Sequence, residues 1–260
     1  MNLGISGRRA VVCGGSKGLG FAAARSLARE GVHLTLVARS ADALAVAART
    51  LRDETGVDVE TVAADLATEA GRAAVLERAG TVDILLANPG IRQVPEDFRT
   101  LSLDAWHGWM DAHCFSSLEL IRAVAPGMCE RRFGRIVNMS VSFIKFPQVG
   151  FAQSHAARLA LAGAIAAIAR ELIPHNVVIN SVCPGLFETD ALITNLHGHA
   201  QRGNTTYEAI VADRLRHCPA GRFADPAECG DLIAFLCSAQ NGFMTAQNIV
   251  NDGGVYQGLF

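Results

Sequence analysis

The sequence of 260 residues contains only two tyrosines, Tyr207 and Tyr256, and neither is followed by a lysine four residues later. A tyrosine and a lysine one helical turn apart are therefore excluded as a catalytic acid and its supporting cation. The sequence also lacks a basic stripe, and its formal net charge is −2. This charge balance argues against nucleic acid or an anionic membrane as the main partner.

Long apolar runs and paired cysteine motifs are lacking as well. The longest apolar stretch, 159–169, is shorter than the roughly twenty residues that a membrane span needs, and residues 1–10 contain no apolar signal core. The seven cysteines are odd in number and form no C-x-x-C motif or His/Cys ligand cluster. We therefore expect a cytoplasmic protein with reduced, mostly buried thiols. His197, His199 and His217 lack ligand spacing or a firm carboxylate partner, so no metal is assigned.

Strand-like and helical runs alternate along the whole chain. The expected strands are 10–13, 32–38, 57–63, 82–86, 135–139, 177–182 and 248–250, and the expected helices are 21–30, 42–55, 69–79, 103–129, 154–172 and 226–238. Alternation of this kind predicts a single doubly wound, Rossmann-like α/β domain over 1–260, with a mostly parallel central sheet and helices on both faces. Pro126 is expected to disturb the end of its helix. The least regular segment, 186–222, is expected to be a long loop that serves as a lid or binds substrate.

A glycine-rich loop separates the first expected strand from the first helix. Its spacing is Gly14-x-x-x-Gly18-x-Gly20. A helix N-terminus carries unpaired N–H groups and a partial positive charge, and glycine lets a pyrophosphate approach the backbone. This position and spacing therefore predict a dinucleotide site. A plain helix-capping turn is the alternative interpretation.

The end of the second strand indicates which dinucleotide is preferred. A carboxylate there would bind the adenosine ribose and favour NAD, but the sequence reads Ala38-Arg39-Ser40. Lys17 and Arg39 supply two cations and suit a 2′-phosphate, so we predict that NADPH binds at least about tenfold tighter than NADH. Alternatively, both cations are solvated surface charges.

These motifs together resemble the short-chain dehydrogenase/reductase family over almost the whole chain. The resemblance includes the glycine loop, Ala87-Asn88-Pro89-Gly90 after a middle strand, Pro184-Gly185 followed by Thr189, and the ending Asn251-Asp252-Gly253-Gly254. Matched position by position, it implies cofactor contacts from Gly14, Ser16, Lys17, Gly18, Leu19, Gly20, Arg39, Asp65, Leu66, Asn88, Gly90, Arg158, Pro184, Gly185 and Thr189.

The resemblance also locates the catalytic positions, and all four differ from the family's usual residues. The family's serine position is Val141 here, its tyrosine is Ser154, its lysine is Arg158 and its asparagine is His113. Reduction of a carbonyl builds negative charge on oxygen, which a nearby acid must neutralise. A serine hydroxyl is a poor acid beside a phenol with a pKa of about 10.

Other residues are candidates for the missing functions. Arg158 can hold ribose hydroxyls and supply positive charge, but arginine stays charged and does not readily pass on a proton. His113 is a candidate donor through a water shared with Ser154, because histidine ordinarily titrates near neutrality. A packing histidine is an equally good interpretation. His155 should point about 100° away from its neighbour on the helix, and Ser140 or Ser142 could replace the lost serine if the loop is shifted.

The first functional hypothesis is an NADP(H)-dependent oxidoreductase of the carbonyl reductase or alcohol dehydrogenase type, acting on a small molecule through His113, Ser154 and Arg158. A non-redox isomerase or lyase, or a catalytically inactive NADP(H)-binding sensor, is the alternative. The resemblance further implies a homo-oligomer, with a tetramer favoured. An apolar helical stripe of Leu159, Ala162, Ala166 and Ala169 would permit close packing, although burial within one subunit explains it equally well. Trp106 and Trp109 either border the site or anchor their helix, and anchoring is the favoured interpretation.

Overall fold

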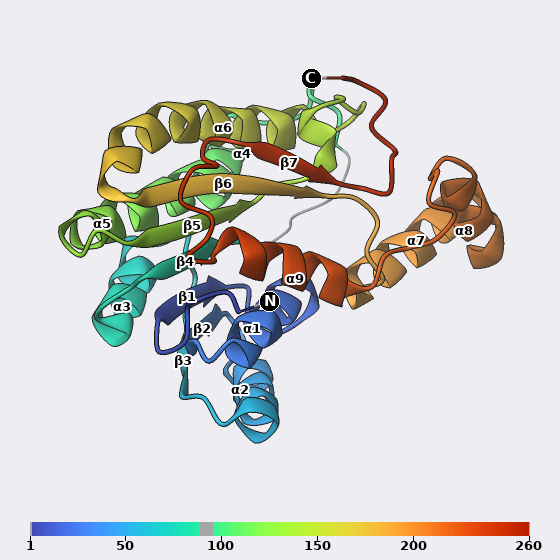
Figure 1. Cartoon of the computed structure of the whole chain (residues 1–260). Helices are drawn as coiled ribbons and strands as arrows, with labels where there is room; N and C mark the ends of the chain where they lie inside the picture. The colour runs from blue at the N-terminus through green and yellow to red at the C-terminus, as the bar shows by residue number, and fades with distance from the viewer. Residues whose placement is uncertain (1, 89–95, 260) are drawn as a thin grey trace.

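A computed structural model describes residues 2–88 and 96–259, so the expected contact residue Gly90 lies outside the described part. Within these ranges the chain forms one seven-stranded sheet in which all neighbouring strands are parallel, in the order β3-β2-β1-β4-β5-β6-β7 (Figure 1). The strands are β1 (Arg9–Cys13), β2 (His33–Ala38), β3 (Val59–Ala63), β4 (Ile84–Ala87), β5 (Gly134–Met139), β6 (Val177–Pro184) and β7 (Asn248–Asn251). The expected Rossmann-like α/β fold is confirmed.

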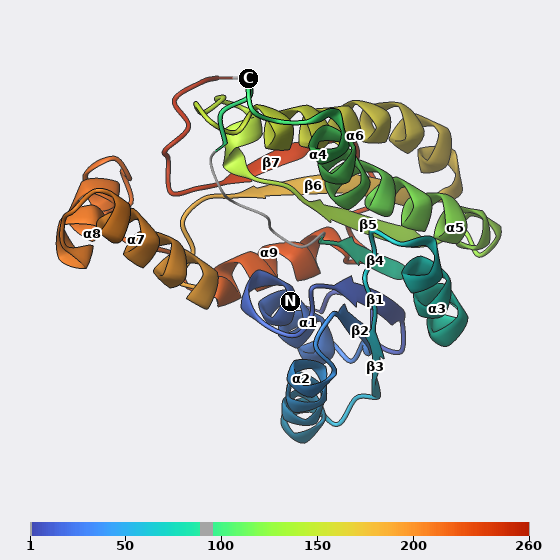
Figure 2. The same ribbon diagram turned by 180° about the vertical axis from the view of Figure 1, so that it is seen from behind.

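Helices cover both faces of the sheet, as Figures 1 and 2 show. The helices are α1 (Gly18–Arg29), α2 (Ala41–Thr55), α3 (Glu69–Ala79), α4 (Leu103–Met110), α5 (Ser116–Glu130), α6 (Ala152–Leu172), α7 (Asp190–Arg202), α8 (Tyr207–Arg216) and α9 (Pro226–Leu236). Two apolar cores result, because strands buried on both faces carry apolar side chains on both sides. One core contains Leu27, Leu44 and Ile233 from α1, α2 and α9. The other contains residues of α3, α5 and α6.

The long helix expected at 103–129 has a different form. The turn η1 (Asp111–Phe115) is a π-helix that separates α4 from α5. Helix α5 continues past Pro126 to Glu130, so the expected disturbance near its end does not stop it. The side chains of Val124, Ala125 and Met128 are buried around the proline, and this packing holds the helix together despite one missing hydrogen bond.

The segment 186–222 was expected to be a loop, and that prediction was wrong. Helices α7 and α8 occupy most of it and extend away from the sheet in Figure 1. Thr189 and Thr206 cap the two helices by accepting hydrogen bonds from backbone N–H groups three residues on. An acidic residue follows each cap in the first helical turn, which the helix dipole favours. Glycines and scattered polar residues obscured these two start signals in the sequence.

Backbone bonds bring the carboxyl ends of the strands together at one edge. The N–H of Gly15 donates to Val37 O at 3.2 Å, that of Ala64 to Ala38 O at 2.9 Å, and that of Ser140 to Val182 O at 2.8 Å. The chain builds the sheet outward from β1 to β2 and β3, and then returns to place β4 on the other side of β1. Ligands of open α/β sheets bind at such a switch point, where two neighbouring strands connect to opposite sides of the sheet.

The state of the cysteines and the length of the helices can be compared with the sequence-based expectations. All seven cysteines are free, and all but Cys129 are buried, as expected for structural thiols. Among the described residues, we find no helix with the length and apolarity required to cross a bilayer.

Candidate active site

The glycine loop follows β1 and is too tightly folded for side chains at two of its glycines. A Cβ at Gly20 would lie 2.2 Å from the carbonyl oxygen of Gly14. A Cβ at Gly14 would lie 2.7 Å from Nδ2 of Asn88, which follows β4. Gly14 and Gly18 also have positive φ angles of 67° and 59°, which glycine adopts without strain. The loop therefore leads from β1 into α1 with its glycine backbone close to Asn88, which follows β4.

Helix α1 starts directly behind this loop and has an open N-terminus. Lys17 is its N-cap residue and makes no side-chain capping bond, and the first turn contains no acidic residue. The neighbouring helix α2 differs, because Ser40 Oγ accepts the N–H of Ala43 at 3.3 Å. The free N–H groups of α1 therefore fit an anionic group such as a pyrophosphate.

The predicted adenosine contacts lie beside the loop at the ends of β2 and β3. Lys17 and Arg39 are exposed, and within the described ranges neither has a carboxylate in ion-pair contact. Asp65 folds into a turn in which its Oδ1 accepts the N–H of Ala67 at 3.0 Å. Leu66 is half-buried next to it. The structure thus brings these four residues to the same edge as the glycine loop.

The predicted nicotinamide contacts follow β6. Gly185 donates its N–H to Asn251 O at 2.9 Å. A Cβ at Gly185 would lie 2.6 Å from Cα of Asp252, so only glycine fits there. Thr189 lies across from the glycine loop, since a Cβ at Gly18 would be 3.7 Å from its Cγ2. Pro184, Gly185 and Thr189 therefore lie on the opposite side of one site.

Arg158 and Ser154 lie one turn apart on α6 and form a buried pair. Arg158 Nε donates to Ser154 Oγ at 3.3 Å, and Arg158 Nη1 reaches Met139 O at 3.5 Å. The Arg158 side chain is almost fully buried, with 5% of its surface exposed. Burial lowers the pKa of Arg158 to about 10, which leaves the guanidinium charged at neutral pH. No carboxylate from the described ranges forms an ion pair with it.

His113 lies in the π-helical turn η1 and is 1% exposed. Its ring stacks on that of Trp109, with centroids 4.9 Å apart, so Trp109 is buried against the candidate site as well as anchoring α4. Neither ring nitrogen has a hydrogen-bond partner among the described residues. Burial, helped by the positive charge of Arg158, lowers the pKa of His113 to about 3. The expectation that it titrates near neutrality is therefore wrong, and His113 is a neutral imidazole at neutral pH.

Further buried polar atoms lack partners near these residues. Gln153, which directly precedes Ser154, is fully buried, and both atoms of its side-chain amide are unpartnered within the described residues. Asn138 at the end of β5 donates to Ser181 Oγ at 3.2 Å but leaves its own Oδ1 without a donor. Buried polar groups are nearly always satisfied. The orphaned atoms of Gln153, Asn138 and His113, with the charge of Arg158, therefore fit a site that takes a polar ligand or water.

Sequence reasoning missed Gln153 and Asn138. The available signal was a polar residue beside Ser154 in an otherwise Ala-rich and Leu-rich helix, and a polar residue ending an apolar strand. His155 does point elsewhere, as expected, because its Nε2 accepts the N–H of Gln148 at 3.0 Å. Val141 is half-buried, and both Ser140 and Ser142 beside it are buried.

Two cavities lie outside the cluster formed by His113, Ser154 and Arg158. One of about 430 Å³ lies at the amino ends of β1, β2 and β3 and is lined by Arg9, His33 and Arg52 among others. The other, of about 300 Å³, adjoins Gly18 and Thr189. Within the described ranges, no group of three His, Cys, Asp or Glu side chains is arranged to hold a metal ion.

Comparison with known proteins gives consistent results over almost the whole chain. The family model described as enoyl-(acyl carrier protein) reductase matches residues 14–256. The 3-oxoacyl-[acyl-carrier-protein] reductase of Vibrio cholerae is 31% identical over 254 residues, covering 98% of this chain and 99% of that protein. The acetoacetyl-CoA reductase of Shinella zoogloeoides is 30% identical over 252 residues, covering 96% and 98%. The structure of L-sorbose reductase from Gluconobacter frateurii, complexed with NADPH and L-sorbose, superimposes with a TM-score of 0.93 at 33% identity and covers both chains fully.

Proposed function

Because this chain belongs to the short-chain dehydrogenase/reductase family, we propose that it is an NADP(H)-dependent reductase of small carbonyl compounds with an altered catalytic site. The observation that carries the proposal is the open N-terminus of α1 at a glycine loop in which a Cβ at Gly20 would lie 2.2 Å from the carbonyl oxygen of Gly14. Similar proteins that are named as reductases, one of them complexed with NADPH, support it. We further propose that 1–260 works as one domain.

The residues around the switch point are suited to hold this cofactor. The backbone of Gly18, Leu19 and Gly20 would hold the pyrophosphate, while Ser16 and Asn88 border it. Lys17 and Arg39 would bind the 2′-phosphate, and Asp65 and Leu66 would border the adenine. Pro184, Gly185 and Thr189 would cover the nicotinamide end, where Arg158 would hold ribose hydroxyls; we keep Gly90 as a proposed contact from sequence alone. NADPH, when bound, supplies a hydride to the substrate carbonyl carbon.

Ser154 and Arg158 would then stabilise the oxygen of the substrate. Arg158 Nε donates to Ser154 Oγ, so the hydroxyl hydrogen is free to donate to a carbonyl oxygen. The charged guanidinium lies one helical turn away in a buried environment, where it stabilises negative charge strongly. Ser154 thus orients the carbonyl, and Arg158 offsets the charge that develops on it.

The proton would come from water rather than directly from a side chain, and a proton from bulk solvent would convert the hydroxide left behind back to water. With a pKa of about 3, His113 is neutral at neutral pH. One ring nitrogen can then donate a hydrogen bond and the other can accept one, without a change of charge. In this role His113 would hold a water beside Ser154, in the space that a larger side chain at position 154 would fill.

A cofactor-binding protein without turnover is the second candidate. One observation favours it: His113 has a pKa of about 3 and Arg158 one of about 10, so neither titrates near neutral pH. General acids usually work best when their pKa lies near the working pH. A non-redox isomerase or lyase is compatible with the same observation.

Deuterium transfer separates these candidates. NADPH deuterated at its transferable position is incubated with the protein and a mixture of carbonyl compounds, and products are examined by mass spectrometry. A deuterated alcohol supports the reductase. The control is a Gly20→Val variant, whose side chain would enter the space of the Gly14 carbonyl and should abolish labelling. Protein that binds NADPH but labels no product contradicts the reductase and favours a sensor, whereas a product formed without label favours an isomerase or lyase.

We also propose a homotetramer built partly on α5 and α6. Leu159 on α6 and Phe115, the η1 residue that directly precedes α5, are exposed apolar side chains. The predicted stripe is divided, however, because Ala169 is fully buried within the subunit while Leu159 is exposed. Light scattering tests the proposal, and a monomer would contradict it.

A further inference from the structure

The chain contains only two lysines, against twenty-one arginines, and both lie near the proposed site. Lys17 belongs to the glycine loop. Lys145 follows the short helix η2 (Ser142–Ile144) after β5, and its N–H donates to Ser142 O at 3.0 Å. Its side chain is half-buried and forms no ion pair with the described residues. An ammonium group that is partly removed from water without a counter-charge is a candidate anion contact.

The pKa of the Cys183 thiol, near the end of β6, is affected by charged groups that include Lys145. Burial raises the pKa of Cys183 to about 11, and the positive charges of Lys145 and then Arg158 act against that rise. Backbone geometry agrees, because Ser140 bonds to Val182 and Arg158 reaches Met139 on the adjacent strand. The two cations therefore lie around the same strand ends.

Among the described residues, one carboxylate, that of Asp252, raises the pKa of Cys183, and it already accepts two backbone hydrogen bonds. Asp252 accepts the N–H of Gly254 at 3.0 Å through Oδ1 and that of Tyr256 at 2.9 Å through Oδ2. These bonds hold the turn after β7 in place. The area around Cys183 therefore has an excess of positive charge that Asp252 only partly offsets.

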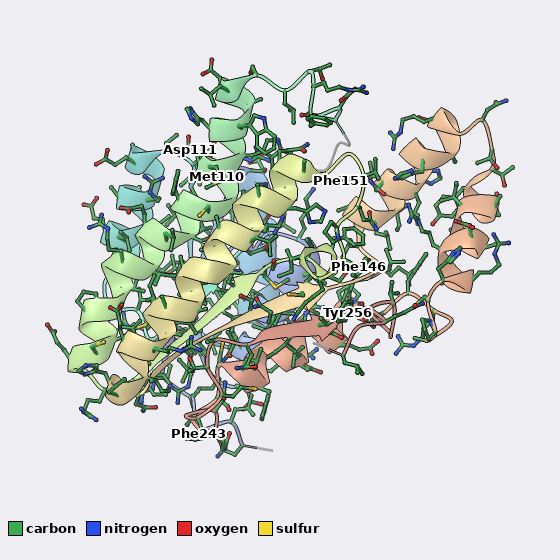
Figure 3. The ribbon with its side chains drawn as sticks, turned by 90° about the horizontal axis from the view of Figure 1, so that it is seen from above. Met110, Asp111, Phe146, Phe151, Phe243 and Tyr256 are labelled. Carbon is green, nitrogen blue, oxygen red and sulfur yellow. The ribbon has the colours of Figure 1, made fainter. Side chains whose placement is uncertain are left out.

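Phe146 directly follows Lys145 in the chain and belongs to a group of aromatic side chains. Phe146 and Tyr256 are stacked with centroids 5.9 Å apart and an interplanar angle of 16°. Phe143 meets Phe146 edge-on at 5.4 Å. Figure 3 shows Phe146 and Tyr256 side by side. A ligand held by Lys145 would thus have an apolar wall beside it.

We propose that the substrate is an oxo acid, whose carboxylate pairs with Lys145 while its apolar part lies against Phe146 and Tyr256. This inference rests on the proposed reductase function and names its substrate class. One free ammonium group matches a carboxylate better than a phosphate monoester, which would bring up to two charges and three strong acceptors. Arg158 remains with the carbonyl oxygen and the cofactor, so the two cations have separate tasks.

The test uses aryl-substituted 2-, 3- and 4-oxo acids, each paired with its methyl ester, and the protein saturated with NADP⁺. Calorimetry measures binding, and NADPH oxidation measures turnover separately. We expect at least one acid to bind about ten- to a hundredfold tighter than its ester, because a charge-assisted hydrogen bond is lost in the ester. Lys145→Met should reduce the affinity for the acid to that for the ester, whereas Lys145→Arg should retain most of it.

The two lysines allow an independent measurement. Acetylation with an N-hydroxysuccinimide ester, followed by mass spectrometry, should show protection of Lys145 by the acid and of Lys17 by NADPH. Thermal unfolding confirms that Lys145→Met is folded. Equal binding of every acid and ester, failure of every acid to bind, or unchanged acid affinity in Lys145→Met overturns the proposal.

The outcomes separate this inference from the function on which it rests. Binding of an acid that depends on Lys145, without NADPH oxidation, supports the carboxylate site and contradicts the reductase. Equal reduction of acid and ester by the wild type and by Lys145→Met supports the reductase and contradicts the carboxylate site.

Discussion

The buried imidazole of His113 should make the stability of the protein depend on pH in a calculable way. In the folded state its pKa is lowered from 6.5 to about 3, mainly by burial and further by the charge of Arg158. The unfolded chain binds a proton at this residue near its ordinary pKa, whereas the folded chain does not. Stability should therefore fall as pH decreases below about 6.5, and it continues to fall until the folded-state pKa is approached.

The magnitude follows from linkage. Between about pH 7.5 and about pH 5, proton uptake by one group of pKa 6.5 in the unfolded state alone lowers the free energy of unfolding by about 2 kcal/mol. The variants His113→Asn and His113→Phe both remove this titration. Because other groups titrate in wild type and variants alike, the difference between them isolates His113.

Urea denaturation at the two pH values measures this difference. Wild type should lose about 2 kcal/mol more than either variant over this interval. The two variants serve as controls for each other, since Asn and Phe differ in packing but share the absence of a titrating ring. Parallel losses in all three proteins would refute the assignment of a neutral, buried His113.

Three further predictions concern the cofactor site and the catalytic positions. Lys17→Ala and Arg39→Ala should each weaken NADPH binding about tenfold, because each removes a charge-assisted contact to the 2′-phosphate. NADH lacks this phosphate, so its binding should be nearly unchanged in fluorescence titrations. Equal losses of affinity for both cofactors would contradict this prediction. Gly20→Ala should lower the free energy of unfolding by about 1–3 kcal/mol, because its Cβ would lie 2.2 Å from a backbone oxygen; an unchanged melting temperature would argue against the loop geometry. The double variant Ser154→Tyr with Arg158→Lys places a phenol and an ammonium group one helical turn apart. The rate of carbonyl reduction, measured by NADPH oxidation, should rise at least about tenfold. No gain in a folded variant would show that these two positions do not limit turnover.

The fold could be predicted from the sequence because its signals are local and repeated. Apolar strands alternate with helices, and glycine follows β1 where the backbone must turn closely. Parallel pairing follows from crossover connections and needs no knowledge of side-chain contacts. Helices α7 and α8 were missed because their caps are single threonines in a segment with several glycines, and capping contributes only about 1 kcal/mol.

The relative positions of two candidate site residues could be predicted, but their charge states could not. The family resemblance assigned Ser154 and Arg158 to positions four residues apart on a helix, and their hydrogen bond on α6 agrees with that spacing. Their catalytic role stays a prediction. The protonation of His113 depends on how completely α4, η1 and α6 exclude water, which no local pattern encodes. The orphaned amide of Gln153 was invisible for the same reason, since its burial is a property of packed helices.

Two buried arginines differ in how completely their guanidinium groups are satisfied by hydrogen bonds. Arg135 is satisfied: its guanidinium bonds to the carbonyls of Ser238, Gly134 and Asn176 and packs on the ring of Phe133, 4.4 Å away. Arg158 has two long bonds, one of them to a hydroxyl. Replacing a poorly compensated buried charge with an apolar side chain often stabilises a protein. A selection for thermal stability alone would therefore be expected to retain Arg135 and discard Arg158, so keeping Arg158 would indicate selection for ligand binding.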